Sequence, residues 1–191
     1  MNASLRTTIQ ASISISDDDL DYMLTFFKPM ILKKNNFFLK SGNYCSHVVY
    51  LKSGLLRIYY TNENGEEITC YFSLETEFVT SLASFSKEIR SIENIQAIVT
   101  TELLVISKID LEKLYQELPN TQELGRKAIE KIALNMEKRI FLFLNKNAEE
   151  RYQDMLKNNP ILIKKVPLKY LASYLGITPQ HLSRLRKTIV S

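Results

Sequence analysis

The sequence has few of the residues that metal sites and disulfides need. Among 191 residues there are two cysteines, two histidines and no tryptophan. Cys45 and Cys70 are isolated from each other, and His47 is far from His181. We therefore expect no metal site, because a structural zinc ion needs four ligands held together. Two isolated cysteines are typical of reduced thiols in a cytoplasmic protein.

Targeting and membrane signals are also absent. No apolar run approaches the roughly 20 residues that a membrane span needs. The first ten residues are mixed and polar, without the basic and apolar regions of a secretory signal. We expect a cytoplasmic protein with no membrane partner.

Motifs of known catalytic sites are missing as well. There is no Gly-x-Ser-x-Gly, no phosphate-binding loop and no Cys–His arrangement. An enzyme built on a cupin-like barrel would need a cluster of His and Glu, and the barrel region contains only His47. We predict that the chain is not an enzyme and has no catalytic residues.

Acidic residues are unevenly distributed. Residues 1–120 carry 11 basic and 15 acidic residues, a balance of −4. Residues 121–191 carry 14 basic and 6 acidic residues, a balance of +8, and no acid follows Asp154. This split indicates a neutral-to-acidic module joined to one with a polyanionic partner.

Short β-rich runs separated by turn residues fill residues 30–107. Asn64-Gly65 between two such runs is typical of a hairpin with a tight type I′ turn. Many short strands at this spacing predict a small antiparallel roll or barrel. The predicted strands are Phe37–Leu39, Val48–Leu51, Leu55–Tyr60, Ile68–Phe72, Ile95–Val99 and Leu103–Ile106.

Helical periodicity lies on both sides of this β-rich part, which makes the class α+β. Ser16 is a suitable N-cap for the first of the predicted helices. The sequence Asn158-Asn159-Pro160 is expected to end the last of these helices. The predicted helices are Asp17–Phe27, Asp110–Leu118, Thr121–Asn145 and Ala148–Lys157.

The helix predicted at Thr121–Asn145 carries an apolar stripe with spacings of three and four residues. The stripe could be covered by the chain's own core or could form a coiled-coil-like dimer seam. Its length of about 36 Å favours the seam, because a small roll offers too little surface to cover it. The stripe consists of Leu124, Ala128, Ile129, Ile132, Ala133, Met136, Ile140 and Phe143.

Residues 167–187 have the spacing of a helix-turn-helix. Gly176 follows a short apolar helix face at the point where the chain must turn sharply. Thr178 is a good N-cap for a second helix, and Pro179 suits its first position. The second helix would enter the major groove of double-stranded DNA.

Polar residues on the two helices are the candidate DNA contacts. Gln180 can bond adenine in bidentate fashion, and Arg184 can do the same to guanine. Lys169, Tyr170 and Ser173 lie where the first helix would cross the phosphate backbone. The other predicted contacts are Thr178, Pro179, His181, Ser183, Arg186 and Lys187.

From about residue 15 to 187 the chain resembles the Crp/Fnr family of bacterial regulators. The resemblance is carried by Leu171–Lys187, by Glu149–Tyr152 followed by Pro160, and by Val49–Tyr59 with Asn64–Glu66. It implies a cyclic-nucleotide-binding-like sensory β-roll (1–118), a dimerisation helix (119–146) and a helix-turn-helix domain (147–191). It also implies double-stranded DNA and a second copy of the chain as partners, with RNA polymerase as a further candidate.

The effector pocket departs from the family pattern. The family's cyclic-nucleotide binders carry a Gly-Glu pair and then an Arg-Ser or Arg-Ala pair. Here Thr76-Glu77-Phe78 has the Glu without the Gly, and Arg90-Ser91 is about one residue out of register. A cyclic phosphate would lack its matched guanidinium. We therefore expect a degenerate pocket, with a cyclic nucleotide disfavoured and another small-molecule effector, or none, in its place.

We therefore predict a homodimeric, sequence-specific DNA-binding transcription regulator. The alternative is a ligand-binding or protein-interaction module whose basic helical tail docks on a protein partner. The two hypotheses share the roll and differ in what the basic face binds.

Overall fold

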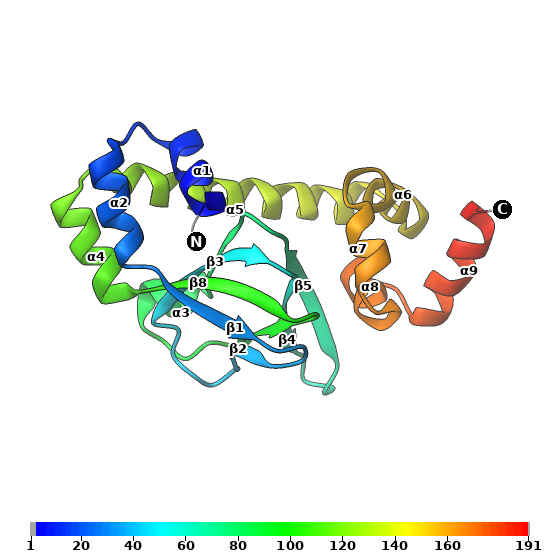
Figure 1. Ribbon diagram of the computed structural model, residues 1–191. Helices are drawn as coiled ribbons and strands as arrows, with labels where there is room; N and C mark the ends of the chain where they lie inside the picture. Colours follow the sequence, from blue (N-terminus) through cyan, green and yellow to red (C-terminus); the bar gives the residue numbers. More distant parts are fainter. Residues whose placement is uncertain (1–2, 191) are drawn as a thin grey trace.

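Two four-stranded antiparallel sheets face each other and form a β-roll. The computed structural model describes residues 3–190, with side chains up to Thr188 (Figure 1). One sheet has the order β1 (Lys28–Leu32), β8 (Thr101–Ser107), β3 (His47–Ser53), β6 (Phe78–Val79). The other has the order β2 (Phe37–Leu39), β7 (Glu93–Ala97), β4 (Leu56–Thr61), β5 (Glu67–Ser73). The predicted α+β class and β-roll are confirmed.

Alternation along the strands divides the apolar side chains between two cores. On β3, Val49 and Leu51 lie in the core between the sheets. Val48 and Tyr50, on the other face of the same strand, belong to a cluster with the N-terminal helices. This two-residue period is what a strand requires when both of its faces are covered.

The hairpin predicted at Asn64-Gly65 joins β4 to β5, as expected. Residues 62–66 form its loop, and the Asn62 N–H donates to the Glu66 carbonyl at 3.0 Å. Of the two central residues only Gly65 has a positive φ, at 80°. The hairpin is confirmed, but the type I′ geometry is wrong, because that turn needs positive φ at both residues.

Three helices cover the outer face of the first sheet. They are α1 (Ala3–Ser12), α2 (Asp17–Thr25) and α4 (Lys108–Glu117), and a short α3 (Leu82–Lys87) follows β6. Ser16 caps α2 as predicted, since its hydroxyl accepts from the Asp19 N–H at 3.1 Å. Helix α1 was not predicted; Leu5 and Ile9, four residues apart, are fully buried in the helical cluster.

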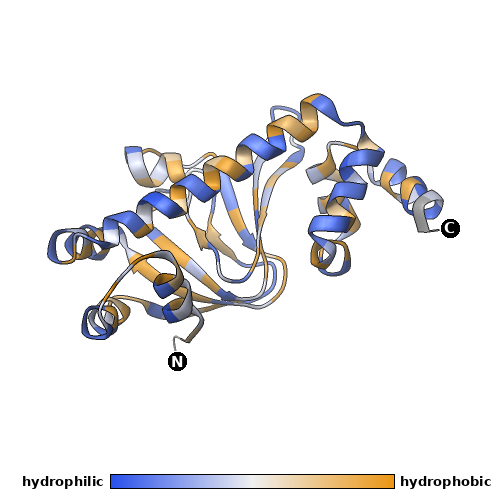
Figure 2. Cartoon of the chain, turned by 90° about the horizontal axis from the view of Figure 1, so that it is seen from above, coloured by the Kyte–Doolittle hydropathy of each residue, from blue (hydrophilic) through white to orange (hydrophobic). Residues whose placement is uncertain are grey.

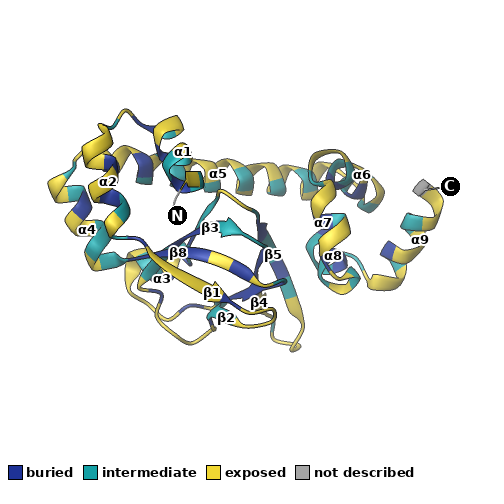
Figure 3. Ribbon diagram, viewed as in Figure 1, coloured by how far each residue is buried: buried dark blue, intermediate teal, exposed yellow. Residues whose placement is uncertain are grey.

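The long helix α5 (Thr121–Asn145) has the predicted bounds. Its first half lies across the roll, and its second half extends to the C-terminal helices (Figure 1). Half-buried and exposed residues alternate along it (Figure 3), and so do apolar and polar ones (Figure 2). The predicted stripe therefore divides. Leu124 is buried in the chain's own core, and Ala128 and Ile132 are half-buried, whereas Ile129, Ala133, Met136, Ile140 and Phe143 are exposed.

The C-terminal part consists of α6 (Ala148–Asn158), α7 (Pro160–Lys165), α8 (Leu168–Leu175) and α9 (Pro179–Val190). The break predicted at residues 158–160 is present, but Pro160 also begins α7, which was not predicted. One apolar cluster joins these helices to the roll. It combines Leu55, Phe72 and Ile98 of the roll with residues of α6, α7, α8 and α9. The helices therefore rest on the roll instead of standing apart from it.

Two glycines with positive φ provide a test of the roll. Gly54 has a φ of 110°, and an added Cβ would lie 2.8 Å from the Thr101 Cα. Gly42 has a φ of 87°, and nothing lies within 4 Å of its Cβ position. We expect Gly42→Ala to lower the free energy of unfolding by about 1–2 kcal/mol through backbone strain alone. Gly54→Ala should lower it by about 3 kcal/mol or more, because overlap with backbone is added to the strain. Urea denaturation measures both, and equal effects would contradict the close approach at Gly54.

Candidate nucleic-acid interface

Helices α8 and α9 form the predicted helix-turn-helix around Gly176. Gly176 has a φ of 68°, and its N–H donates to the Ser173 carbonyl at 3.1 Å. The next N–H, of Ile177, donates to the Ala172 carbonyl at 3.0 Å. An added Cβ at Gly176 would lie 2.8 Å from a ring carbon of Phe143. Both the backbone conformation and the space therefore require glycine at this turn.

The start of α9 is capped as the sequence predicted. The Thr178 hydroxyl accepts from the His181 N–H at 3.2 Å, and Pro179 is the first residue of the helix. Leu182 is fully buried against the cluster that contains Leu171 and Ala172 of α8. These contacts hold the second helix across the first with one face inward.

The opposite face of α9 carries the predicted base-reading residues. Gln180, Ser183 and Arg184 are exposed. Their spacing of three and four residues places them on one side of the helix, and Lys187, also exposed, continues the same side one turn later. The structure thus brings together an amide, a hydroxyl and two cations on one exposed helical surface, which we call the α9 face.

Other predicted contact residues lie beside this face. Pro179 and Thr178 are exposed at its N-terminal end, and His181 is half-buried. Arg186 is half-buried too, and its guanidinium donates to the Ile163 carbonyl of α7 at 3.4 Å. That hydrogen bond turns Arg186 toward α7, away from the α9 face.

The three residues predicted on α8 lie at the junction with the roll. The Ser173 hydroxyl accepts from the Thr69 N–H at 2.9 Å and donates to the Glu67 carbonyl at 2.8 Å. Both partners are on β5. Tyr170 lies over the Arg57 guanidinium, and the Lys169 ammonium lies 4.7 Å from the Tyr170 ring centroid. The sequence predicted DNA contacts for all three residues and gave no sign that Tyr170 and Ser173 contact the roll.

Arg57 is the centre of this junction. Its side chain is fully buried, and its guanidinium carbon lies 4.0 Å from the Tyr59 ring centroid and 3.7 Å from that of Tyr170. The Glu67 carboxylate accepts from it at 2.6 Å, and the Thr69 hydroxyl at 2.9 Å. A buried cation needs such partners, because an unpaired one costs several kcal/mol. One of those partners, Tyr170, belongs to the helix-turn-helix.

A second arginine connects the end of α5 with both parts. The Arg139 guanidinium donates to the Thr69 carbonyl at 3.2 Å and to the Tyr174 carbonyl at 3.0 Å. It also lies over the rings of Phe143 and Tyr174, at 4.7 and 4.1 Å. Together with Arg57 and Ser173, this residue forms what we call the roll–helix junction. No residue of the junction was identified as such from the sequence.

Of the four residues predicted for an effector pocket, Glu77 and Phe78 line one cavity, and Arg90 and Ser91 do not line it. This cavity has a volume of about 140 Å³ and lies beside α5. The Glu77 carboxylate accepts from the Ser73 hydroxyl at 2.8 Å and from the Tyr71 hydroxyl at 3.2 Å. Burial and this carboxylate raise the pKa of Tyr71 well above its ordinary value. Phe78 packs on Tyr50, with ring centroids 5.2 Å apart.

The Arg90–Ser91 pair offers no cation to a cyclic phosphate. The Arg90 guanidinium donates to the Gly42 carbonyl at 2.7 Å and lies over the exposed ring of Tyr44. The hydroxyl of the buried Ser91 lies 3.0 Å from that of Ser81, which donates to the Glu93 carboxylate at 2.7 Å. A carboxylate next to these hydroxyls would repel a phosphate. These residues do not fit a cyclic nucleotide.

Among residues 3–190 no cluster of three or more His, Cys, Asp or Glu side chains could hold a metal ion. Cys45 and Cys70 are free thiols, and burial raises the pKa of Cys70. No helix in the described range is long and apolar enough to cross a membrane.

Comparison with known proteins supports the fold. Residues 29–118 match the family model described as the cyclic nucleotide-binding domain. The transcriptional activator protein Anr of Pseudomonas aeruginosa is 27% identical over 148 residues, which are 77% of this chain. The chain spans 59% of the length of that relative.

Two solved structures share the fold. The c-di-GMP-responsive regulator CLP of Xanthomonas campestris superposes with a TM-score of 0.73 at 16% identity, with 91% of each chain covered. A Crp/Fnr-family protein of Eubacterium rectale gives a TM-score of 0.71 at 18% identity, covering 91% of this chain and 83% of that one.

The Ser173 contact with β5 can be tested by a single substitution. Ser173→Ala removes the acceptor of the Thr69 N–H and should lower the free energy of unfolding by about 1–3 kcal/mol, because a largely buried donor is left unpaired. Hydrogen exchange at Thr69 should become faster in the same variant. Ser183→Ala, which changes an exposed serine on α9, is the matched control and should change neither quantity. Unchanged exchange at Thr69 in Ser173→Ala would contradict the contact.

Proposed function

We propose that the chain is a member of the Crp/Fnr family and acts as a homodimeric, sequence-specific DNA-binding transcription regulator; the cyclic nucleotide-binding domain at residues 29–118 and the likeness to Anr support this. The α9 face carries the proposal. A helix buried on one side by Leu182 and exposing Gln180 and Arg184 on the other has the form needed to enter a major groove. The positive balance after residue 120 adds attraction to the phosphate backbone.

Base reading is assigned to two residues. Arg184 would make bidentate bonds to guanine O6 and N7, and Gln180 would do the same to adenine. Ser183 and Lys187 would contact phosphates or base edges from the same side of the helix. Tyr170 and Ser173 already bind the roll, so a phosphate contact from either would require the roll–helix junction to open.

The exposed apolar residues of α5 support the homodimer. Met136 and Ile140 are 56% and 59% exposed. Large apolar side chains that lie exposed together on one side of a helix usually mark an interaction surface. A second copy of α5 packed against them would form a two-helix seam. The twofold axis would present two α9 faces about one DNA turn apart, matching a pseudo-palindromic site.

The three-part division is retained in this proposal: residues 1–118 sense, 119–146 dimerise and 147–191 bind DNA. RNA polymerase would be the partner of the promoter-bound dimer, since the Anr relative is named a transcriptional activator. Such a regulator acts in the bacterial cytoplasm, where the chromosome is. The alternative, a module that docks on a protein partner, has no support in these relatives.

The DNA-reading assignment is tested by substitution on the α9 face. Arg184→Ala should weaken binding to a duplex selected from a random pool by about 10- to 100-fold, because one bidentate base contact is lost. Lys34→Ala, which removes an exposed lysine of the roll, should leave affinity unchanged. Fluorescence anisotropy over a series of salt concentrations separates base reading from phosphate attraction. Full affinity and specificity in Arg184→Ala would refute the assignment.

The dimer seam is tested by placing a charge on it. Ile140→Glu should raise the dimer dissociation constant by about 100-fold, because a carboxylate would be buried without a partner. Ile31→Glu makes the same change at a residue of β1 that is 71% exposed, and should leave the dimer intact. Sedimentation velocity over a range of concentrations measures both. A dimer that tolerates Ile140→Glu would place the seam elsewhere.

A further inference from the structure

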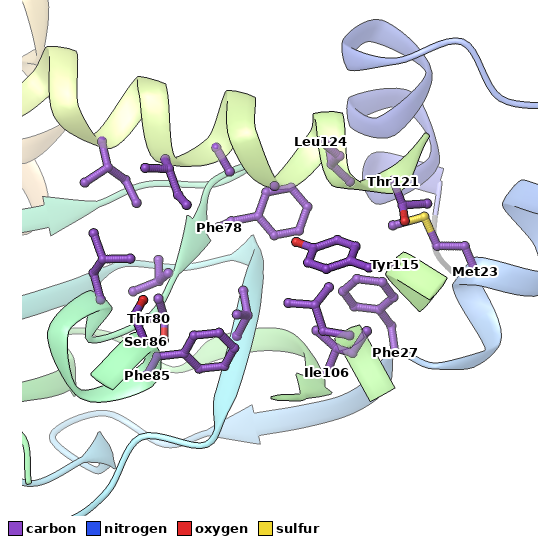
Figure 4. A pocket seen from close by; sticks show the side chains of 18 residues that line it. Met23, Phe27, Phe78, Thr80, Phe85, Ser86, Ile106, Tyr115, Thr121 and Leu124 are labelled. Carbon is purple, nitrogen blue, oxygen red and sulfur yellow. The ribbon is translucent and has the colours of Figure 1, made fainter. Parts of the chain in front are cut away.

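A cavity of about 200 Å³ lies between α5 and the outer face of the first sheet. Val48 of β3 and Ile106 of β8 form one wall, and Leu124, Ala128 and Ile132 of α5 form the opposite one. Phe78 of β6 also lines it (Figure 4). Ile129, which also lines it, is 50% exposed, so the cavity opens to the surface beside α5.

The lining is mostly apolar and carries no charge. None of the described residues around the cavity is charged, and most are aliphatic or aromatic. The Thr80 hydroxyl donates to the His47 carbonyl at 3.0 Å, and the Thr121 hydroxyl donates to the Leu118 carbonyl at 2.6 Å. These two hydroxyls are therefore already engaged. Such a wall excludes nucleotides, sugar phosphates and ions, which would lose hydration without gaining partners.

Two further hydroxyls line the cavity, that of Ser86, which is exposed to solvent, and that of the half-buried Tyr115. The Tyr115 hydroxyl has no hydrogen-bond partner among the described residues, and in Figure 4 it points toward Phe78, between α5 and the strands. Burial raises the pKa of Tyr115, and its protonated hydroxyl can donate or accept one hydrogen bond.

Gly125 leaves room for the Tyr115 hydroxyl. A Cβ at residue 125 would collide with the Tyr115 hydroxyl. Glycine inside a helix lowers stability by about 1 kcal/mol relative to alanine. Here the missing side chain leaves space for the Tyr115 ring hydroxyl. The combination of Gly125 and Tyr115 therefore builds one polar point into an apolar space.

We propose that this cavity binds a small, uncharged, mainly apolar molecule with one hydrogen-bonding group that faces Tyr115. A cavity of about 150 Å³ holds benzene, so about 200 Å³ suits a substituted benzene or a bicyclic ring of indole size. The site is separate from Arg90 and Ser91, which do not line it. The proposal depends on the roll and α5 alone and stands or falls independently of DNA binding.

Indole and its carbocyclic isostere indene are the probes, titrated by NMR into the full chain without DNA. We expect saturable binding of indole with a dissociation constant of about 0.1–1 mM. Ala128→Leu fills the cavity from α5 and should weaken binding at least about tenfold. Val48→Phe fills the cavity from the opposite wall and should weaken binding to the same extent. It provides the same measurement if Ala128→Leu fails to fold.

Tyr115→Phe tests the polar point. It should lower the preference for indole over indene by about 3- to 10-fold, which corresponds to one hydrogen bond. Tyr44→Phe makes the same change at an exposed tyrosine of the roll and should leave the preference unchanged. Absence of saturable binding, or binding that both filling variants leave intact, would overturn the proposal. Loss of binding at protein concentrations where the chain dimerises would assign the cavity to the partner's side chains and would also overturn it.

Discussion

Helix α5 has apolar side chains on two sides, and its own chain covers only one of them. Leu124 is buried beneath the N-terminal helices, and Ile132 faces the roll, whereas Met136 and Ile140 face outward. A helix of this kind needs a second surface to cover its exposed side. The same helix forms a wall of the apolar cavity, and its Phe143 lies against Gly176 at the turn between α8 and α9. A change on any one side of α5 therefore reaches the other two.

The roll–helix junction makes the position of the helix-turn-helix depend on the roll. Arg57 is a buried cation, and the Tyr170 ring of the helix-turn-helix is one of its contacts. Separation of the two parts would expose this arginine and leave the Thr69 N–H without the Ser173 hydroxyl. Because of those losses, the helix-turn-helix packed on the roll is one distinct state, and small rotations of it away from the roll are unfavourable. Since Arg139 of α5 bonds both β5 and α8, a displacement of α5 would act directly on that state.

Much of the fold could be predicted because its signals are local. The bounds of α5, the cap at Thr178 and the hairpin at Gly65 follow from periodicity and turn chemistry. Helix α1 was missed because its two buried residues give too short an apolar pattern in the sequence, and they become buried only by packing on the roll. Helix α7 was missed because Pro160 indicated a break, although proline is equally suited to the first turn of a new helix.

The site was harder to predict than the fold. The α9 face was predictable because capping and spacing determine which residues point outward. In contrast, nothing in the sequence distinguishes the buried Arg57 from a surface arginine, because its partners come from β5 and α8, more than 100 residues apart. The direction of Arg90 depends on a bridge to Tyr44 that pairs two loops, and such long-range pairing has no local signal.

The chemistry of two regions of the roll bears on what it can sense. Around Ser81 and Ser91 the hydroxyls are paired with each other and with Glu93, which leaves an environment suited to neither an anion nor an apolar group. Beside α5 the lining is mostly apolar and uncharged, and the half-buried Tyr115 phenol has no hydrogen-bond partner within residues 3–188. A ligand gains most where it covers apolar surface and completes an unmet hydrogen bond. Such a ligand would touch α5 directly, so the helix that carries the dimer seam would be the first element to respond to it.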